Sequence, residues 1–317
     1  MAMIPYIIRR IAQSVIVLIG VTIVVFILLQ LLPGGPARAL LGPRATALQV
    51  HEFIVQNGYN KPFWIQYGNY IGRLLQGNLG YSIHYNQTVN SLLAQDLPKS
   101  VLLVGLSYVV SVAIAIPLGI LQAVRRNRPI DYTLTGASFI GYSMPVFWLG
   151  ILLILIFAVY LHALPPEGPQ GTTIQAVLAQ PLGLVLPVAT LSIVTVAQFS
   201  RFMRSAAIDN LVQDYIRTAR ANGLSTRAVL FRHLLRNSLI PIITLIGLSL
   251  PATISGAVIT ESVFNYPGMG LLLWTAATVR DYPVLLGFTV VVGAATVAGS
   301  LLADVLYAVA DPRVRYA

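Results

Sequence analysis

The residue types that usually perform catalysis or bind metals are sparse in this sequence, and their spacing forms no recognisable site. The 317-residue chain has no cysteine, and its four histidines are scattered without metal-ligand spacing. Its ten acidic residues show no carboxylate pair of the kind that glycosidases or aspartic proteases use. A GxxxxGKS/T phosphate-binding loop is absent from the sequence. These features predict a chain that is not an enzyme and binds no cofactor or metal of its own.

Two carboxylates lie within or beside apolar segments and are the remaining candidates for chemistry. Asp304 lies inside the last apolar segment, where a charged group is costly and is usually paired or functional. It is either a site for a proton or a substrate amine, or a helix-end charge that reaches the interface or pairs with an arginine such as Arg236. Glu261 ends another apolar segment, so it either lines the mouth of a path or is a solvated helix end.

The densest charge in the second half of the chain lies in residues 201–239, between two apolar segments. Its arginines are Arg201, Arg204, Arg217, Arg220, Arg227, Arg232 and Arg236. Asp214 is the expected N-cap of a short helix that begins at Tyr215, Gly223 its left-handed C-terminal residue, and Ser225 the cap of the next helix. Such a helix–glycine–helix segment is either a docking surface for a partner, or a basic loop that sets topology and binds anionic lipid.

Composition places these residues in an integral membrane protein. The chain is 56% hydrophobic and 9% charged, and its mean hydropathy is +0.78, whereas a soluble domain is typically about 25% charged. The net charge of +10 does not indicate a nucleic-acid partner, because the arginines gather in short segments beside apolar ones.

Six apolar segments are long enough to cross a bilayer, so the predicted fold is an all-α protein with six transmembrane helices. Residues 1–32 form an N-terminal anchor, since the apolar run from Ile11 to Leu32 exceeds the ~7–15 residues of a signal peptide. Residues 33–99 form a small extramembrane region. Residues 100–317 form a core whose spans cover 100–124, 132–161, 182–200, 240–260 and 283–310.

Further features of these spans bear on function. Pro145 is expected to break the third span, and the neighbouring Met144, Phe147 and Trp148 are candidates for lining a translocation path. The stretch GMGLLLWTAATV, between Glu261 and Tyr282, is too short to cross, so it is expected to be a re-entrant or surface helix. The excess of arginine predicts that both termini and residues 201–239 are cytoplasmic, with residues 33–99 on the other side.

Several motifs resemble one family over nearly the whole chain. DYIRTARANGLS followed by FRHLLRNSLIPIIT resembles the loop motif of permease subunits in ATP-binding-cassette importers, in the dipeptide/oligopeptide/nickel branch. LLPGGPA, KPFWIQYGNYIGRLLQGNLGYSI, ESVFNYPGMGLL and LLADVLYAVADPRVR are similar to this branch in the same order. The general signature has Glu-Ala-Ala and then Gly. Here Arg217-Thr218-Ala219 and Gly223 occupy those positions, and Arg217 in place of Glu is typical of the peptide branch.

The resemblance implies a type I importer permease in a bacterial or archaeal plasma membrane. Its partners would be a second homologous permease subunit, two ATPase subunits that bind ATP and Mg, and an extracytoplasmic solute-binding protein. It implies that the ATPase is contacted by Asp214, Tyr215, Arg217, Thr218, Ala219, Arg220, Gly223, Leu224 and Ser225.

The sequence leaves alternatives open for both the solute and the class of protein. The expected solute is a di- or oligopeptide, with nickel or glutathione as alternatives. A proton-coupled secondary transporter that uses Asp304 and a non-transporting membrane scaffold are the functional alternatives.

Overall fold

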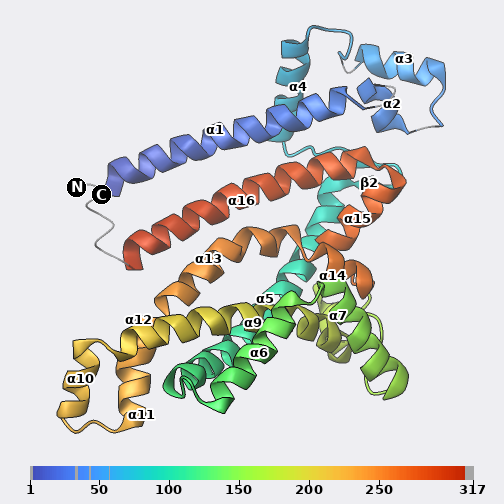
Figure 1. Ribbon diagram of the computed structural model, residues 1–317. Coiled ribbons are helices and arrows are strands. Elements are labelled where there is room, and N and C mark those ends of the chain that lie inside the picture. The colour runs from blue at the N-terminus through green and yellow to red at the C-terminus, as the bar shows by residue number, and fades with distance from the viewer. Residues whose placement is uncertain (1–2, 33–34, 43, 57, 311–317) are drawn as a thin grey trace.

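The computed structural model describes residues 3–32, 35–42, 44–56 and 58–310, and the described chain is almost entirely helical (Figure 1). Within it, five helices are long and apolar enough to cross a membrane, or six if one sharply bent pair counts as a single span. The first half of the chain forms α1 (Met3–Gln30), α2 (Gly35–Leu41), α3 (Ala47–Gln56), α4 (Phe63–Leu75), β1 (Tyr81–Ser82), β2 (Gln87–Thr88), α5 (Val89–Val124), α6 (Pro129–Ser143), α7 (Val146–Leu153) and the π-helix η1 (Ile154–Tyr160).

The second half contains further helices and a second π-helical segment. These elements are α8 (Ile174–Leu178), α9 (Pro181–Leu211), α10 (Asp214–Ala221), α11 (Thr226–Ala228), η2 (Val229–Leu234), α12 (Leu235–Ser238), α13 (Ile240–Ser255), α14 (Val258–Val263), α15 (Met269–Val279) and α16 (Tyr282–Ala310). The predicted all-helical membrane fold is confirmed.

Helices α5 and α9 form the central pair of the bundle. Gly119 of α5 lies so close to α9 that a Cβ there would be 2.6 Å from the Cβ of Met203. Ser107 and Ser111 each donate to the carbonyl four residues earlier in α5, at 2.8 and 2.6 Å, and Ser192 of α9 donates to the carbonyl of Ser107 at 3.2 Å. Small and hydroxyl side chains therefore allow close packing without leaving polar groups unsatisfied.

Both central helices are longer than the predicted spans 100–124 and 182–200. Helix α5 begins at Val89, where the Thr88 hydroxyl accepts from the amide of Ser91, and α9 continues to Leu211. The predicted limits followed the change from apolar to polar residues. A helix whose polar turns lie outside the hydrocarbon layer, or are paired, continues past that change.

The third predicted span, residues 132–161, is broken as expected. Helix α7 continues directly into η1, and the axis of this combined helix makes an angle of 103° with that of α6. Met144, immediately before Pro145, has an extended backbone with φ −72° and ψ 129°, since the proline ring disfavours helical geometry in the preceding residue.

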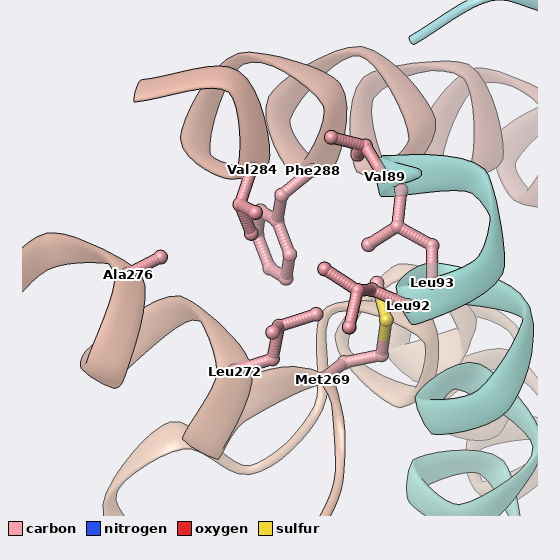
Figure 2. Close-up of a cluster of buried hydrophobic side chains, with 8 residues drawn as sticks. All are labelled: Val89, Leu92, Leu93, Met269, Leu272, Ala276, Val284 and Phe288. Carbon is pink, nitrogen blue, oxygen red and sulfur yellow. The ribbon is translucent and has the colours of Figure 1, made fainter. Parts of the chain in front are cut away.

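The predicted fifth span, residues 240–260, is not one helix. Helix α13 ends at Ser255, because Gly256 has φ +77°, and the short α14 follows. The next helix, α15, has 11 residues and is too short to cross a bilayer, as predicted. Figure 2 shows the core that fixes α15: Met269 and Leu272 pack against Leu92 and Leu93 of α5 and against Phe288 of α16.

The bundle has two distinct ends (Figure 1). Helices α10 and α11 project at the end where α1 begins and α16 finishes. Helices α2, α3, α4 and α15 lie at the opposite end. At that end Phe26 of α1 contacts the rings of Phe63, Tyr67 and Tyr70 of α4, at centroid distances of 5.2–5.5 Å.

Candidate functional site

The strongest candidate site is the α10 segment, residues 213–225, which projects from one end of the bundle (Figure 1). Helix α10 starts at Asp214, one residue earlier than predicted. Its N-cap is Gln213, whose backbone is extended and whose side chain makes no capping bond, so the predicted N-cap role of Asp214 is wrong. Asp214 instead occupies the first turn, where its negative charge favours the helix N-terminus, and pairs with Arg217 at 3.5 Å.

The C-terminal end of α10 is a Schellman motif centred on Gly223. The amide of Leu224 donates to the carbonyl of Ala219 at 3.3 Å, and the amide of Gly223 donates to that of Arg220 at 3.0 Å. Gly223 has φ +77°, a conformation that a Cβ would strain. The Ser225 hydroxyl accepts from the amide of Ala228, which caps α11. The predicted backbone roles of Gly223 and Ser225 are therefore confirmed.

One face of α10 anchors the segment to the central helix pair. Ile216 and Ala219 are buried in a cluster with Ala123 of α5 and Ala207 of α9. Val229 and Leu234 of η2 complete this cluster. Leu230 is partly buried beside them, and Tyr215 donates a 2.6 Å hydrogen bond to Asn210. The segment after Ser225 thus presents an apolar face to this cluster, and the helix there is of the π type.

The other face of α10 is exposed and mainly polar. The side chains of Asp214 and Arg217 are 95% and 75% exposed. Other exposed residues of the segment are Thr218, Arg220, Gly223, Leu224 and Ser225. Helix α10 is thus amphipathic, with an apolar face held by the bundle and a charged face open to a partner.

An ion pair that was not predicted from the sequence lies beside this segment. Arg204 of α9 donates two 2.8 Å bonds to Asp131 of α6, which is almost fully buried. Asp131 also accepts from the backbone amide of Asn127 at 3.0 Å. The position of Asp131 in the first turn of a helix was a visible signal, but nothing in the sequence identified a partner 73 residues away.

Glu261 is buried, so its interpretation as a solvated helix end is wrong. Its carboxylate accepts from Ser100 at 2.8 Å and from the backbone amides of Ala257, Gly270 and Leu271 at 3.0, 2.7 and 3.2 Å. Because these donors belong to α5, to the start of α14 and to the first turn of α15, Glu261 fastens three elements together. A Cβ at Gly268 would lie 2.5 Å from this carboxylate.

The remaining path candidates lie on elements other than α14. Met144, Phe147 and Trp148 lie together at the break between α6 and α7, and the last two are about half exposed, at 49% and 47%. The side chain of Asp304 lies outside the described residues. Among the described residues, no group of three His, Asp or Glu side chains is arranged to hold a metal ion.

The fold is that of an ATP-binding-cassette importer permease. It superposes on a chain from the inward-facing structure of the MetNI methionine ABC transporter with a TM-score of 0.52 and 17% sequence identity, over 68% of this chain and 96% of that one. At this identity the likeness concerns the fold alone.

Sequence comparison then gives the family. Residues 115–316 match the binding-protein-dependent transport system inner membrane component, and residues 3–104 match the N-terminal part of such membrane components. The chain therefore belongs to the binding-protein-dependent transport system inner membrane components. It is a multi-pass inner membrane permease component of an ABC transporter, not the ATPase subunit.

Named relatives match over their full length. The chain is 40% identical to the oligopeptide transport system permease protein AppB of Bacillus subtilis (strain 168), over 99% of this chain and 100% of that protein. It is 32% identical to the dipeptide transport system permease protein DppB of Escherichia coli (strain K12), over 99% of each chain. The di/tripeptide transport system permease protein DppB of Pseudomonas aeruginosa (strain UCBPP-PA14) is 34% identical over the same shares.

Proposed function

We propose that this chain is a membrane-spanning subunit of an ATP-driven importer of di- or oligopeptides. The observation that carries the proposal is its likeness, over the full length, to permeases named for dipeptide and oligopeptide transport. Nickel and glutathione are the competing solutes, and a competition assay distinguishes them from peptides.

The proposed assembly contains four further subunits. A second homologous permease forms a heterodimer with this chain, two cytoplasmic ATPase subunits bind ATP and Mg, and an extracytoplasmic binding protein delivers the solute. Residues 1–32 serve as the anchor, residues 33–99 face the binding protein, and residues 100–317 form the permease core. Both termini and the α10 segment lie in the cytoplasm of a bacterial or archaeal cell, in keeping with the arginines beside it.

In the proposed mechanism, the α10 segment transmits motion from the ATPase to the membrane helices. The exposed residues of α10 contact the ATPase, with Arg217 and Arg220 supplying charge. The buried residues Ile216 and Ala219 pack against α5 and α9, so a displacement of α10 must move or strain that helix pair. Closure of the ATPases on ATP would thereby bias the bundle between its inward-facing and outward-facing arrangements.

The test uses the whole complex in proteoliposomes and three variants. Gly223→Val is expected to abolish ATP-dependent peptide uptake and co-purification of the ATPase, because valine strains the left-handed turn. Gly223→Asn should keep part of the uptake and part of the ATPase co-purification, since asparagine tolerates this conformation. Gly136→Val, at an exposed helical glycine of α6 where an added Cβ meets no atom within 4 Å, is the matched control and should keep both ATPase binding and uptake.

Two results would refute the proposed function. One is normal ATPase binding and uptake by Gly223→Val. The other is solute uptake without ATPase subunits that is driven by a pH gradient and lost in Asp304→Asn, which would establish the secondary transporter instead.

A further inference from the structure

A partly enclosed cavity lies far from the α10 segment, where α1 ends and α16 begins. Its volume is about 250 Å³. Its apolar wall includes Leu29 of α1 together with Pro283, Leu286 and Val290 of α16. Its polar residues include Tyr59, Tyr70 and Arg73, from α4 and the loop before it. We call it the Arg73 cavity.

Two polar side chains of the Arg73 cavity, Arg73 and Tyr70, are hydrogen-bond donors without sufficient acceptors. Arg73 is half-buried and has no carboxylate partner within the described residues, and its contact with the Tyr59 hydroxyl is long, at 3.5 Å. The hydroxyl of Tyr70 is buried and has no hydrogen-bond partner in the same part of the chain. Burial raises the pKa of Tyr70 to about 12, and the charge of Arg73 opposes this shift, so the phenol is protonated at neutral pH. A guanidinium and an unpaired phenol in one cavity favour an anion with several acceptor oxygens.

The position of the cavity indicates which anion it takes. Leu29 is next to the last residue of α1, and Pro283 is the second residue of α16, so the cavity lies at the level where two membrane helices end. Lipid headgroups occupy this level. Few side chains of α1 between Ile11 and Gln30 are buried within the protein, so hydrocarbon chains can cover this helix beside the cavity.

From these observations we propose that the Arg73 cavity is a binding site for the phosphate of a membrane phospholipid. The phosphate accepts from Arg73 and Tyr70, and the acyl chains stay in the bilayer along α1 and α16. A bound lipid would join α4, α1 and α16, three elements that otherwise meet through few polar contacts, such as Gln30 to Gln66 at 2.7 Å.

The test measures binding to the delipidated complex with three probes: dihexanoyl phosphatidylglycerol, inorganic phosphate and hexanoate. We expect only the phospholipid to bind saturably and to raise the melting temperature. Arg73→Gln should weaken it about tenfold or more, as expected for loss of a charge-assisted hydrogen bond. Native mass spectrometry of the undepleted complex should show a retained phospholipid that Arg73→Gln lacks.

Two further variants separate binding from folding. Tyr70→Phe removes a hydroxyl that has no partner within the described residues, so the lipid-free melting temperature should not fall while phospholipid binding weakens several-fold. Arg38→Gln, an exposed arginine of α2, should bind phospholipid like the unchanged protein.

Each other outcome overturns the proposal. Equal affinities for the unchanged protein, Arg73→Gln and Tyr70→Phe would mean that the cavity does not hold the phosphate. Saturation by inorganic phosphate alone would assign a free-anion site, and tight binding of hexanoate would assign a carboxylate site. No saturable binding by any probe would show that the cavity is not a ligand site.

Discussion

At the scale of single residues, two buried carboxylates accept hydrogen bonds from different kinds of donor. Glu261 is held by one hydroxyl and three backbone amides, and Asp131 by the bidentate guanidinium of Arg204. Burying a charge is costly unless hydrogen-bond donors of the protein replace water. Each carboxylate therefore requires that the elements carrying its donors stay in place around it.

The ion pair predicts a specific pattern of stability. Arg204→Met leaves the buried Asp131 without its counter-ion and should destabilise the protein by on the order of 3–5 kcal/mol, whereas the double variant Asp131→Leu/Arg204→Met should recover much of this loss. Thermal denaturation of the purified protein measures the loss of stability in Arg204→Met and its recovery in the double variant. Arg201→Met, at the neighbouring exposed arginine, is the control. A double variant as unstable as Arg204→Met would show that the loss does not come from an unpaired charge.

For Glu261, the amide variant is the informative one. Glu261→Gln keeps the shape but replaces one acceptor oxygen by an NH₂ group that faces backbone N–H donors. We expect a loss of about 1–3 kcal/mol, measured as a lower melting temperature. Glu167→Gln, at an exposed position, should leave the melting temperature unchanged. An unchanged value for Glu261→Gln would mean that the carboxylate does not hold α14 and α15 in place.

At the scale of elements, the short helices around α10 depend on their caps, because helices of eight and three residues are marginal alone. Ser225→Ala removes the acceptor for the amide of Ala228 and should cost about 1 kcal/mol locally. Hydrogen exchange of amides in residues 226–230 should accelerate about fivefold. Thr226→Ala, the adjacent exposed position, serves as the control, and equal exchange in both variants would exclude a capping role.

The existence of the membrane helices, the break at Pro145 and the turn at Gly223 were predictable, because each depends on local residue types. The limits of α5 and α9 were not, because polar residues beyond the apolar runs are paired with other elements, as Arg204 is with Asp131. The environment of Glu261 could not be predicted either, because its donor Ser100 lies 161 residues away in the chain. Local chemistry can be deduced from sequence, whereas long-range pairing of single polar residues requires the folded arrangement.

At the scale of the whole molecule, the orientation of the bundle can be tested directly. The chain has no cysteine, so single introduced cysteines label without background. Leu75→Cys, at a residue 84% exposed, should react with a membrane-impermeant maleimide from the extracytoplasmic side, and Arg232→Cys near the α10 segment should react only after the membrane is permeabilised. The reverse labelling pattern would invert the proposed topology.

The separation in sequence of α5 and α9 also affects how this protein is made. Helix α5 leaves the ribosome before its main partner, and residues 125–180 must be translated first, which takes several seconds at about 5–20 residues per second. During this wait several polar side chains of α5 can be satisfied within the helix: Ser107 and Ser111 bond to carbonyls of the preceding turn, and Lys99 pairs with Asp96 at 2.7 Å. Helix α5 is thus suited to reside alone in lipid, and the bond that Ser192 donates to Ser107 and the bond that Ser100 donates to Glu261 can form after the later helices insert.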